Sequence, residues 1–394
     1  MKDYGKLLAV FQLQCISAVY ISGIRSFQAA AAVFLIRNDK KMEKLLQLLE
    51  ELHARGALDT QAWCTLLAAG NNEAFRAVAA EKARKLTLER FGNGVFVRGI
   101  VEFSNYCVND CLYCGIRRSN KKAERYRLDE KEILACCKAG YDYGFRTFVL
   151  QSGEDRFWST EKLCVLVQHI KESFSDCAVT LSVGELPRED YRQLFAAGAD
   201  RYLLRHESAS PEHFSMIHPA NQTLASRLEC LDALKEIGFQ TGCGFMVGTP
   251  GQTLEHLACD MAFISSFKPQ MVGIGPFIPH CDTPFADAPC GSGELTLFLL
   301  SLCRIMLPDV LLPATTALGT LLPDGRLQGI LAGANVVMPN ISPMEIRSKY
   351  ALYNNKNSAD PGTAGVLHSE LQKQLSLIGR QILIGRGDYG DRSC

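Results

Sequence analysis

The chain has 394 residues, is 47% hydrophobic and carries a formal net charge of zero. It is long enough to bury a large core, either as two domains or as one barrel. Because neither charge is in excess, the chain has no global field that would attract nucleic acid or an acidic membrane surface.

The first 41 residues differ from the rest. Residues 7–36 are largely apolar, but polar residues such as Gln12 and Arg25 interrupt them, whereas a membrane span needs about 20 cleaner residues. A signal peptide is an alternative, but no convincing cleavage site follows the apolar run. We interpret residues 1–41 as an extension, with translation from Met42 as an alternative start, and expect a cytoplasmic protein.

Residues 42–95 have the apolar period of two or three helices, the first of them amphipathic and beginning at Met42. They precede a long alternation of strand and helix patterns. We expect these helices to pack against the domain that the alternation forms.

From residue 97 onward, apolar runs alternate with helical patterns. Strands are predicted at residues 97–104, 147–152, 178–184, 201–206, 241–247, 271–278, 310–316 and 335–338. Helices are predicted between them at 130–143, 160–173, 188–197, 224–237, 254–267, 294–306 and 324–332. Such a series indicates a parallel sheet. Eight units close most simply into a (β/α)8 barrel of the TIM type over residues 96–340, with an open doubly wound sheet as the alternative and a C-terminal tail over 341–394.

Three cysteines follow the first predicted strand at C-x3-C-x2-C spacing: Cys107, Cys111 and Cys114. Three thiolates can bind three irons of a cubane iron–sulfur cluster and leave the fourth iron open to a non-protein ligand. A structural zinc site would need a fourth protein ligand. The incomplete set predicts a cluster that performs chemistry, with a zinc site or a chance grouping among the 16 cysteines as the alternatives.

Polar residues gather where the predicted strands end, for example at Gln151–Asp155, Arg205–Glu207 and Thr315–Thr316. In parallel α/β barrels this carboxyl-end rim is where active sites are built. Because the cysteine loop also follows a strand, we expect the cluster to lie in the same rim.

The cysteine spacing, with Tyr113 before the third cysteine, resembles that of the radical S-adenosylmethionine (SAM) enzymes. The resemblance implies a 4Fe-4S cluster held by Cys107, Cys111 and Cys114, whose open iron binds SAM and whose electron cleaves it to a 5′-deoxyadenosyl radical. The expected SAM contacts are Tyr113, Gln151, Ser152, Gly153, Glu154, Glu207, Arg227, Met271 and Gly273. Among these, Arg227 would meet the carboxylate and Glu207 the ribose. The alternatives are a surface role for Arg227, a Glu207–Arg205 salt bridge and glycines that only aid packing.

Three more specific stretches resemble the FeFe-hydrogenase maturase HydE family of the biotin synthase-like branch: Gln-Ser-Gly-Glu-Asp at 151–155, Leu-Leu-Arg-His-Glu at 203–207 and Gly-Pro-Phe-Ile-Pro-His at 275–280. The resemblance covers roughly residues 42–390. It implies a barrel cavity lined by Arg98, Thr180, Arg205, Thr315, Thr316, Tyr350 and Tyr353. It also implies a cysteine-bound iron carbonyl cyanide substrate from a second radical SAM maturase, a GTPase scaffold that receives the product, and an electron donor such as flavodoxin or ferredoxin.

The chain departs from this family in one respect. Many members carry a second cluster bound by cysteines near the carboxyl end, but residues 342–393 contain no cysteine. We therefore predict a single cluster.

Three alternatives remain. Biotin synthase would need a second cluster inside the barrel, for which Cys243 is the only well-placed strand cysteine. A methylornithine-forming mutase would share the barrel. A non-catalytic iron–sulfur sensor or scaffold would keep the cluster without cleaving SAM.

Overall fold

The computed structural model describes residues 40–356 and 362–391. The predicted extension over residues 1–41 therefore lies almost wholly outside the described residues. Within the described ranges, no helix is both long and apolar enough to cross a bilayer.

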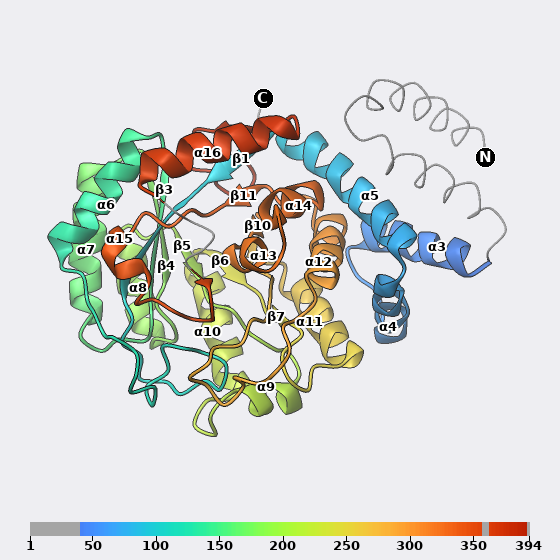
Figure 1. Cartoon of the computed structure of the whole chain (residues 1–394), viewed down its shortest axis with the longest axis horizontal. Helices are drawn as coiled ribbons and strands as arrows, with labels where there is room; N and C mark the ends of the chain where they lie inside the picture. The colour runs from blue at the N-terminus through green and yellow to red at the C-terminus, as the bar shows by residue number, and fades with distance from the viewer. Residues whose placement is uncertain (1–39, 357–361, 392–394) are drawn as a thin grey trace.

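Parallel strands form the centre of the molecule (Figure 1). One sheet has the order β2-β3-β4-β5-β6-β8, a second has the order β10-β11-β1-β12, and β7 pairs with β9. Two bridges join the two larger sheets, Ile100 with Asn340 and Met271 with Leu311. The ring of pairings is thereby closed, which confirms the (β/α)8 barrel and excludes the open sheet.

Most strands of the structure are shorter than predicted: the predicted strands 178–184, 201–206, 271–278, 310–316 and 335–338 begin later or end earlier, whereas 147–152 agrees. Their bounds are β1 (Gly94–Val97), β2 (Gly99–Ser104), β3 (Thr147–Ser152), β4 (Ala178–Ser182), β5 (Arg201–Leu203), β6 (Gln240–Cys243), β7 (Met246–Val247), β8 (Met271–Val272), β9 (Gly275–Pro276), β10 (Pro313–Ala314) and β11 (Val336–Val337).

Three of the predicted strands are split in two. Arg98 separates β1 from β2, Gly244 lies between β6 and β7, and Gly273 lies between β8 and β9. Gly244 has a φ of 154°, and a Cβ there would lie 2.0 Å from the carbonyl oxygen of Gly273. Close backbone approach of two neighbouring strands therefore breaks the regular ladder at this point.

Helices cover the outside of the barrel. Seven correspond to the predicted helices: α6 (Glu130–Asp142), α7 (Thr160–Ser173), α8 (Arg188–Ala196), α10 (Leu224–Ile237), α11 (Leu254–Phe267), α12 (Gly293–Met306) and α14 (Gly325–Leu331). Side-chain caps are present at the starts of α6, α10, α11 and α12; at α6, for example, Asp129 accepts from the backbone N–H of Glu132 in a capping box. Two short helices, α9 (Pro211–Ile217) and α13 (Thr316–Leu321), were not predicted.

The residues before the barrel form α3 (Lys40–Arg55), α4 (Thr60–Ala68), a short 3-10 turn (Ala69–Asn71) and α5 (Glu73–Phe91). They lie beside α11 and α12 at one side of the molecule (Figure 1). The rings of Phe75 and Phe298 meet edge to face at 5.8 Å, and Trp63 is fully buried. The N-terminal helices thus share the main hydrophobic core.

The C-terminal tail contains α15 (Met344–Arg347), α16 (Ala364–Leu377) and β12 (Gln381–Leu383). The strand β12 was not predicted, and it pairs in parallel with β1. Beyond it, Arg386 and Asp388 bind Arg201 at the start of β5. The tail therefore closes the amino end of the barrel, opposite the cysteine loop.

Candidate active site

The cysteine loop follows β2 and is fixed from three sides by backbone hydrogen bonds. Val108 N–H donates to Glu154 O after β3 at 2.9 Å, Leu112 N–H to Ile217 O at 3.0 Å, and Gly115 N–H to Leu352 O at 2.9 Å. Within the loop, Arg117 binds the carboxylate of Asp110 at 2.7 Å. The loop is thus anchored by parts of the chain that are far apart in sequence.

The three thiols of Cys107, Cys111 and Cys114 are partly exposed and close enough to influence one another. Burial is the largest cause that raises the pKa of Cys111 well above its usual range, and the neighbouring thiols are the next. The same two causes raise the pKa of Cys114 to about 12. Deprotonation would therefore accompany metal binding.

The turn after β3 packs directly against the cysteine loop. The N–H of Gly153 donates to Ser104 O at 3.1 Å. A Cβ at Gly153 would lie 2.3 Å from Tyr106 O and 2.8 Å from the Cβ of Cys107. Only glycine leaves room for this contact, so the predicted stretch Gln151–Glu154 does lie beside the first cysteine.

Glu154 adds a buried carboxylate to the same place. Burial raises the pKa of Glu154, and its Oε1 accepts a hydrogen bond from the backbone N–H of Glu185 at 3.1 Å. The structure therefore brings the cysteine loop close to the carboxylate of Glu154 and to the backbone at the ends of β3 and β4.

Arg205 and Glu207 lie at the end of β5 with Arg227 next to them. Arg205 Nη2 is 3.1 Å from Glu207 Oε2, which is the salt bridge that we kept as an alternative. The two groups are within ion-pair distance but are not aligned as a hydrogen bond. Arg205 Nε and Nη2 and Glu207 Oε2 are consequently buried without a hydrogen-bond partner.

Arg227 is buried rather than on the surface. Its Nε donates to Glu185 Oε1 at 2.6 Å and its Nη1 to the carbonyl of Arg205 at 2.6 Å. Although burial opposes its charge, the Glu185 carboxylate raises the pKa of Arg227, so it stays a cation. The helix face of α10 thus delivers a fixed positive charge next to Glu207.

A buried histidine and aspartate support the backbone around Glu207, and sequence reasoning missed them. His206 Nδ1 accepts from Gly244 N–H at 3.3 Å, and its Nε2 lies 3.3 Å from Asp260 Oδ1. Asp260 also accepts from Ala209 N–H at 2.6 Å. Glu207 adopts a φ of 62°, a strained conformation for this residue type. The signal in the sequence was Asp260, a polar residue on the largely apolar face of the predicted helix 254–267.

Thr180, Thr315 and Tyr350, which were expected to line the cavity, have buried polar atoms or are buried. Thr180 is in register with Arg201 on the neighbouring strand, so both share the interior face of the barrel. The Oγ1 atoms of Thr180 and Thr315 are buried without a hydrogen-bond partner. Tyr350 is buried, and after desolvation the charges of Glu102, Tyr126 and the cysteine thiols raise its pKa further, so it lies near the cysteine loop.

Arg98 and Met271 lie elsewhere. Arg98 Nη1 is 3.1 Å from the sulfur of Met271, and its Nη2 donates to Gly387 O at 3.3 Å. Met271 also belongs to a small apolar cluster with Phe96 and Leu311. The structure places both residues at the amino end of the strands and does not bring Met271 to the cysteine loop.

Thr316, Tyr353 and Gly273 are at the ends of their strands or beyond. Thr316 is the first residue of α13, and Tyr353 is half-buried in the segment after α15. The N–H of Gly273 donates to Cys243 O at 2.9 Å, next to Gly244. Gly244 O in turn accepts from Glu207 N–H at 3.0 Å. Gly273 therefore lies near the Glu207 backbone, as expected of a residue in the rim.

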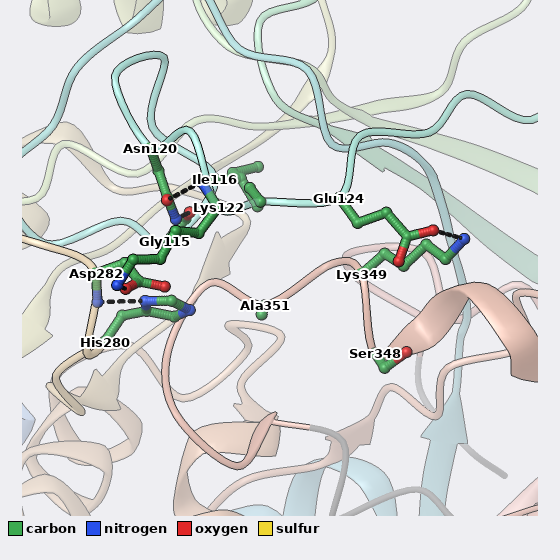
Figure 2. Close-up of a pocket in the computed structure, with 11 residues that line it drawn as sticks. Gly115, Ile116, Asn120, Lys122, Glu124, His280, Asp282, Ser348, Lys349 and Ala351 are labelled. Carbon is green, nitrogen blue, oxygen red and sulfur yellow. Dashed lines mark hydrogen bonds and ion pairs between the residues drawn. The ribbon is translucent and has the colours of Figure 1, made fainter.

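A polar cavity of about 220 Å³ is lined by residues 115–124, which follow the third cysteine, by His280 and Asp282, and by residues 348–351 (Figure 2). Its walls include Gly115, His280 and the Glu124–Lys349 ion pair. His280, Cys281 and Asp282 place three potential metal ligands within 4.8 Å. However, His280 Nδ1 accepts from Asp282 N–H at 3.1 Å, and Asp282 Oδ1 binds Lys122 at 2.7 Å. Both ligand atoms are therefore already used by the protein.

Comparison with known proteins agrees with this geometry. The family model of the radical SAM superfamily matches residues 101–264, which include the cysteine loop and the strand ends described above. The chain is 45% identical over 329 residues to the [FeFe] hydrogenase maturase subunit HydE of Thermotoga maritima, covering 82% of this chain and 90% of that protein.

Two further relatives are more distant. The chain is 29% identical to 3-methylornithine synthase of Methanosarcina acetivorans over 273 residues, which is 68% of this chain and 76% of the relative. The crystal structure of methylornithine synthase (PylB) superposes with a TM-score of 0.74 at 25% identity, covering 85% of this chain and 97% of that one. Radical SAM enzymes use a 4Fe-4S cluster and SAM. The chain belongs to the HydE family, and it is a radical SAM enzyme.

Proposed function

We propose that this enzyme is a maturase for an [FeFe]-hydrogenase and that it acts on a cysteine-bound iron carbonyl cyanide unit. The 45% identity to the [FeFe] hydrogenase maturase subunit HydE of Thermotoga maritima supports the first part. The carrying observation for the second is the set of buried, unpaired polar atoms on Arg205, Thr180 and Thr315. Buried polar groups are nearly always hydrogen-bonded. A polar, anionic ligand inside the barrel would supply the missing partners.

Cys107, Cys111 and Cys114 would hold one 4Fe-4S cluster. When bound, the cluster supplies the electron that cleaves SAM to the 5′-deoxyadenosyl radical. The residues around it would position SAM: the turn over Gln151–Glu154 at the amino group, the Arg227 cation at the carboxylate and Glu207 at the ribose. Tyr113 and the backbone at Gly273 would lie at the adenine. Met271 contributes no contact in this proposal, because it packs on Arg98.

The substrate would bind below SAM, in the interior of the barrel. Arg205 is suited to a carboxylate or an anionic cyanide complex because its guanidinium carries a fixed charge and several directed donors. Thr180, Thr315 and Thr316 supply hydroxyl groups, and Tyr350 and Tyr353 would close the side of the cavity. The unpaired Nε of Arg98 would meet the lower end of the ligand.

In this reading a second radical SAM maturase supplies the substrate and a GTPase scaffold receives the product. Flavodoxin or ferredoxin would supply the electron. We also propose a single cluster, because residues 342–393 contain no cysteine. Chemical analysis after anaerobic reconstitution should then give about four iron atoms per chain, and about eight would contradict it.

The test is maturation of an [FeFe]-hydrogenase in a system that lacks its own HydE. We expect the wild-type chain to restore hydrogenase activity and the Arg205→Met variant, which keeps the cysteines, to restore far less. Failure of a wild-type chain that cleaves SAM to restore activity would reject the maturase assignment. Formation of 3-methylornithine by that chain would instead support the activity of the Methanosarcina relative.

A further inference from the structure

One short segment contacts three consecutive residues of the cysteine loop. It begins at Ile217, the last residue of α9, and ends at Gln222, just before α10. Ile217 O accepts from Leu112 N–H at 3.0 Å. His218 Nε2 is 3.2 Å from the hydroxyl of Tyr113, and Gln222 Oε1 is 3.3 Å from the sulfur of Cys111. We call residues 217–222 the brace.

The geometry fixes the proton on His218. Its Nδ1 lies 3.0 Å from the carbonyl oxygen of Phe214, which can only accept, so Nδ1 carries the hydrogen. Nε2 is therefore the acceptor, and the Tyr113 hydroxyl donates to it. Burial lowers the pKa of His218 to about 3, so the ring stays neutral. It also stacks on Phe214 with ring centres 3.9 Å apart. Within the brace, His218 is thus a fixed, uncharged hydrogen-bond acceptor for the hydroxyl of Tyr113.

The contact at Gln222 depends on whether Cys111 carries a proton. A thiol can donate to the amide oxygen, as the distance of 3.3 Å allows. An iron-bound thiolate has no proton and can only accept. The oxygen and nitrogen of a glutamine amide occupy nearly equivalent positions, so a half-turn of the amide presents its N–H to the same sulfur.

We propose that Gln222 donates a hydrogen bond to the iron-bound sulfur of Cys111 and thereby raises the reduction potential of the cluster. The inference rests on the proposed cluster. Hydrogen bonds to the sulfurs are one of the factors that set the potential of an iron–sulfur cluster. Such a bond draws electron density from the thiolate, which favours the reduced state. Gln222 is a positioning and tuning residue, because it touches a ligand of the cluster and not the reacting atoms.

The test is a redox titration of the reconstituted cluster, followed by electron paramagnetic resonance, in the wild type and in Gln222→Ala, Gln222→Glu and Asn221→Ala. Gln222→Ala removes the amide. Gln222→Glu keeps its size but offers only acceptor atoms and a negative charge. Asn221→Ala removes the neighbouring amide, which is exposed, and serves as the matched control. Iron content is measured first in every sample.

We expect the midpoint potential to become more negative in Gln222→Ala, to fall at least as far in Gln222→Glu and to stay at the wild-type value in Asn221→Ala. Equal potentials in the wild type and both Gln222 variants would overturn the inference while leaving the cluster intact. If the wild-type chain assembled no cluster, the proposed function would fail as well, so the two failures are distinguishable. If Gln222→Glu failed to bind a cluster, the midpoint potential of Gln222→Ala would still test the inference.

Discussion

The two ends of the barrel each carry an arginine with buried nitrogen atoms, but the two arginines differ in their hydrogen bonding. At the amino end, which we call the floor, the Arg201 guanidinium donates to Thr147 Oγ1 at 3.0 Å, to Arg386 O at 2.8 Å and to Asp388 Oδ1 at 2.6 Å. At the carboxyl-end rim, Arg205 leaves two buried nitrogens without a hydrogen bond.

The difference distinguishes an arginine that stabilises the fold, Arg201, from one that could bind a ligand, Arg205. At the floor, the chain itself provides partners for Arg201, because the C-terminal tail brings carbonyl and carboxylate groups to it, whereas Arg98 Nε has no hydrogen bond. At the rim, Arg205 has only Glu207 within ion-pair distance among the described residues. Unpaired buried donors destabilise a folded protein unless a ligand binds them. The unbonded nitrogens of Arg205 therefore mark the rim as the candidate ligand site.

The largest effect should come from Gly153→Ala at the rim. The added Cβ would overlap Tyr106 O and crowd Cys107, so the cysteine loop must move. We expect loss of the bound iron and of all SAM cleavage, measured as iron per chain and as 5′-deoxyadenosine. Gly385→Ala is the control, because no atom lies within 4 Å of its Cβ position. A Gly153→Ala protein with full iron content would contradict the close packing of the two loops.

At the floor, Asp388→Asn should lower stability without affecting the chemistry of the rim. Removing one partner of a buried ion pair costs about 3 kcal/mol. We expect that loss in urea unfolding at pH 7, with SAM cleavage per cluster unchanged. The exposed pair of Arg188 with Glu236 is the control, and Glu236→Gln should change stability by less than about 1 kcal/mol. A large fall in cleavage per cluster would show that the floor takes part in catalysis.

The same carboxylate should make stability depend on pH. Partial burial alone would raise the pKa of Asp388, but hydrogen bonding to Arg386 and the charge of Arg201 lower it below its usual range. Since the folded pKa is depressed, the contribution is complete above the unfolded value of about 3.9 and is lost as the pH falls through the folded pKa. Wild-type stability should therefore fall more steeply below pH 4 than that of Asp388→Asn. Parallel curves would contradict the ion pair.

The smallest effect should distinguish two buried threonines. Thr147 Oγ1 donates to Arg386 O at 2.8 Å and accepts from Arg201, whereas Thr180 Oγ1 has no partner. Thr147→Val should cost about 1–3 kcal/mol of unfolding free energy, and Thr180→Val should cost nothing or stabilise slightly. Thr180→Val should nevertheless reduce hydrogenase maturation if the substrate uses that hydroxyl. Equal losses of stability in Thr147→Val and Thr180→Val would contradict the difference in hydrogen bonding between these two hydroxyl groups.

The sequence was sufficient to predict the fold and the position of the cysteine loop. Long helices such as α7 and α10 have a clear apolar period, so their bounds agree with the structure. Two-residue strands such as β10 and β11 lie inside longer apolar runs, and their ends depend on pairing with neighbours. The short helix α9 starts at Pro211 and has too few residues for a period to show.

The site was only partly predictable. Residues on the strand ends were found because a parallel barrel gathers them. Whether an arginine is paired was not predictable, because Arg201 meets Asp388 from a tail segment 187 residues later. The contact between Arg98 and Met271 was not predictable either, because it joins side chains at the starts of two strands that are 173 residues apart in the sequence. The partners His218 and Gln222 lie in a stretch where no element was predicted.

The most direct test of the rim as a radical-generating site is the amount of 5′-deoxyadenosine formed per chain after anaerobic reconstitution, reduction and addition of SAM. The wild type should form it, with about four iron atoms per chain, and Cys111→Ser should form none. A wild-type chain with its full complement of iron that leaves SAM intact, or a Cys111→Ser chain that still cleaves it, would contradict the account.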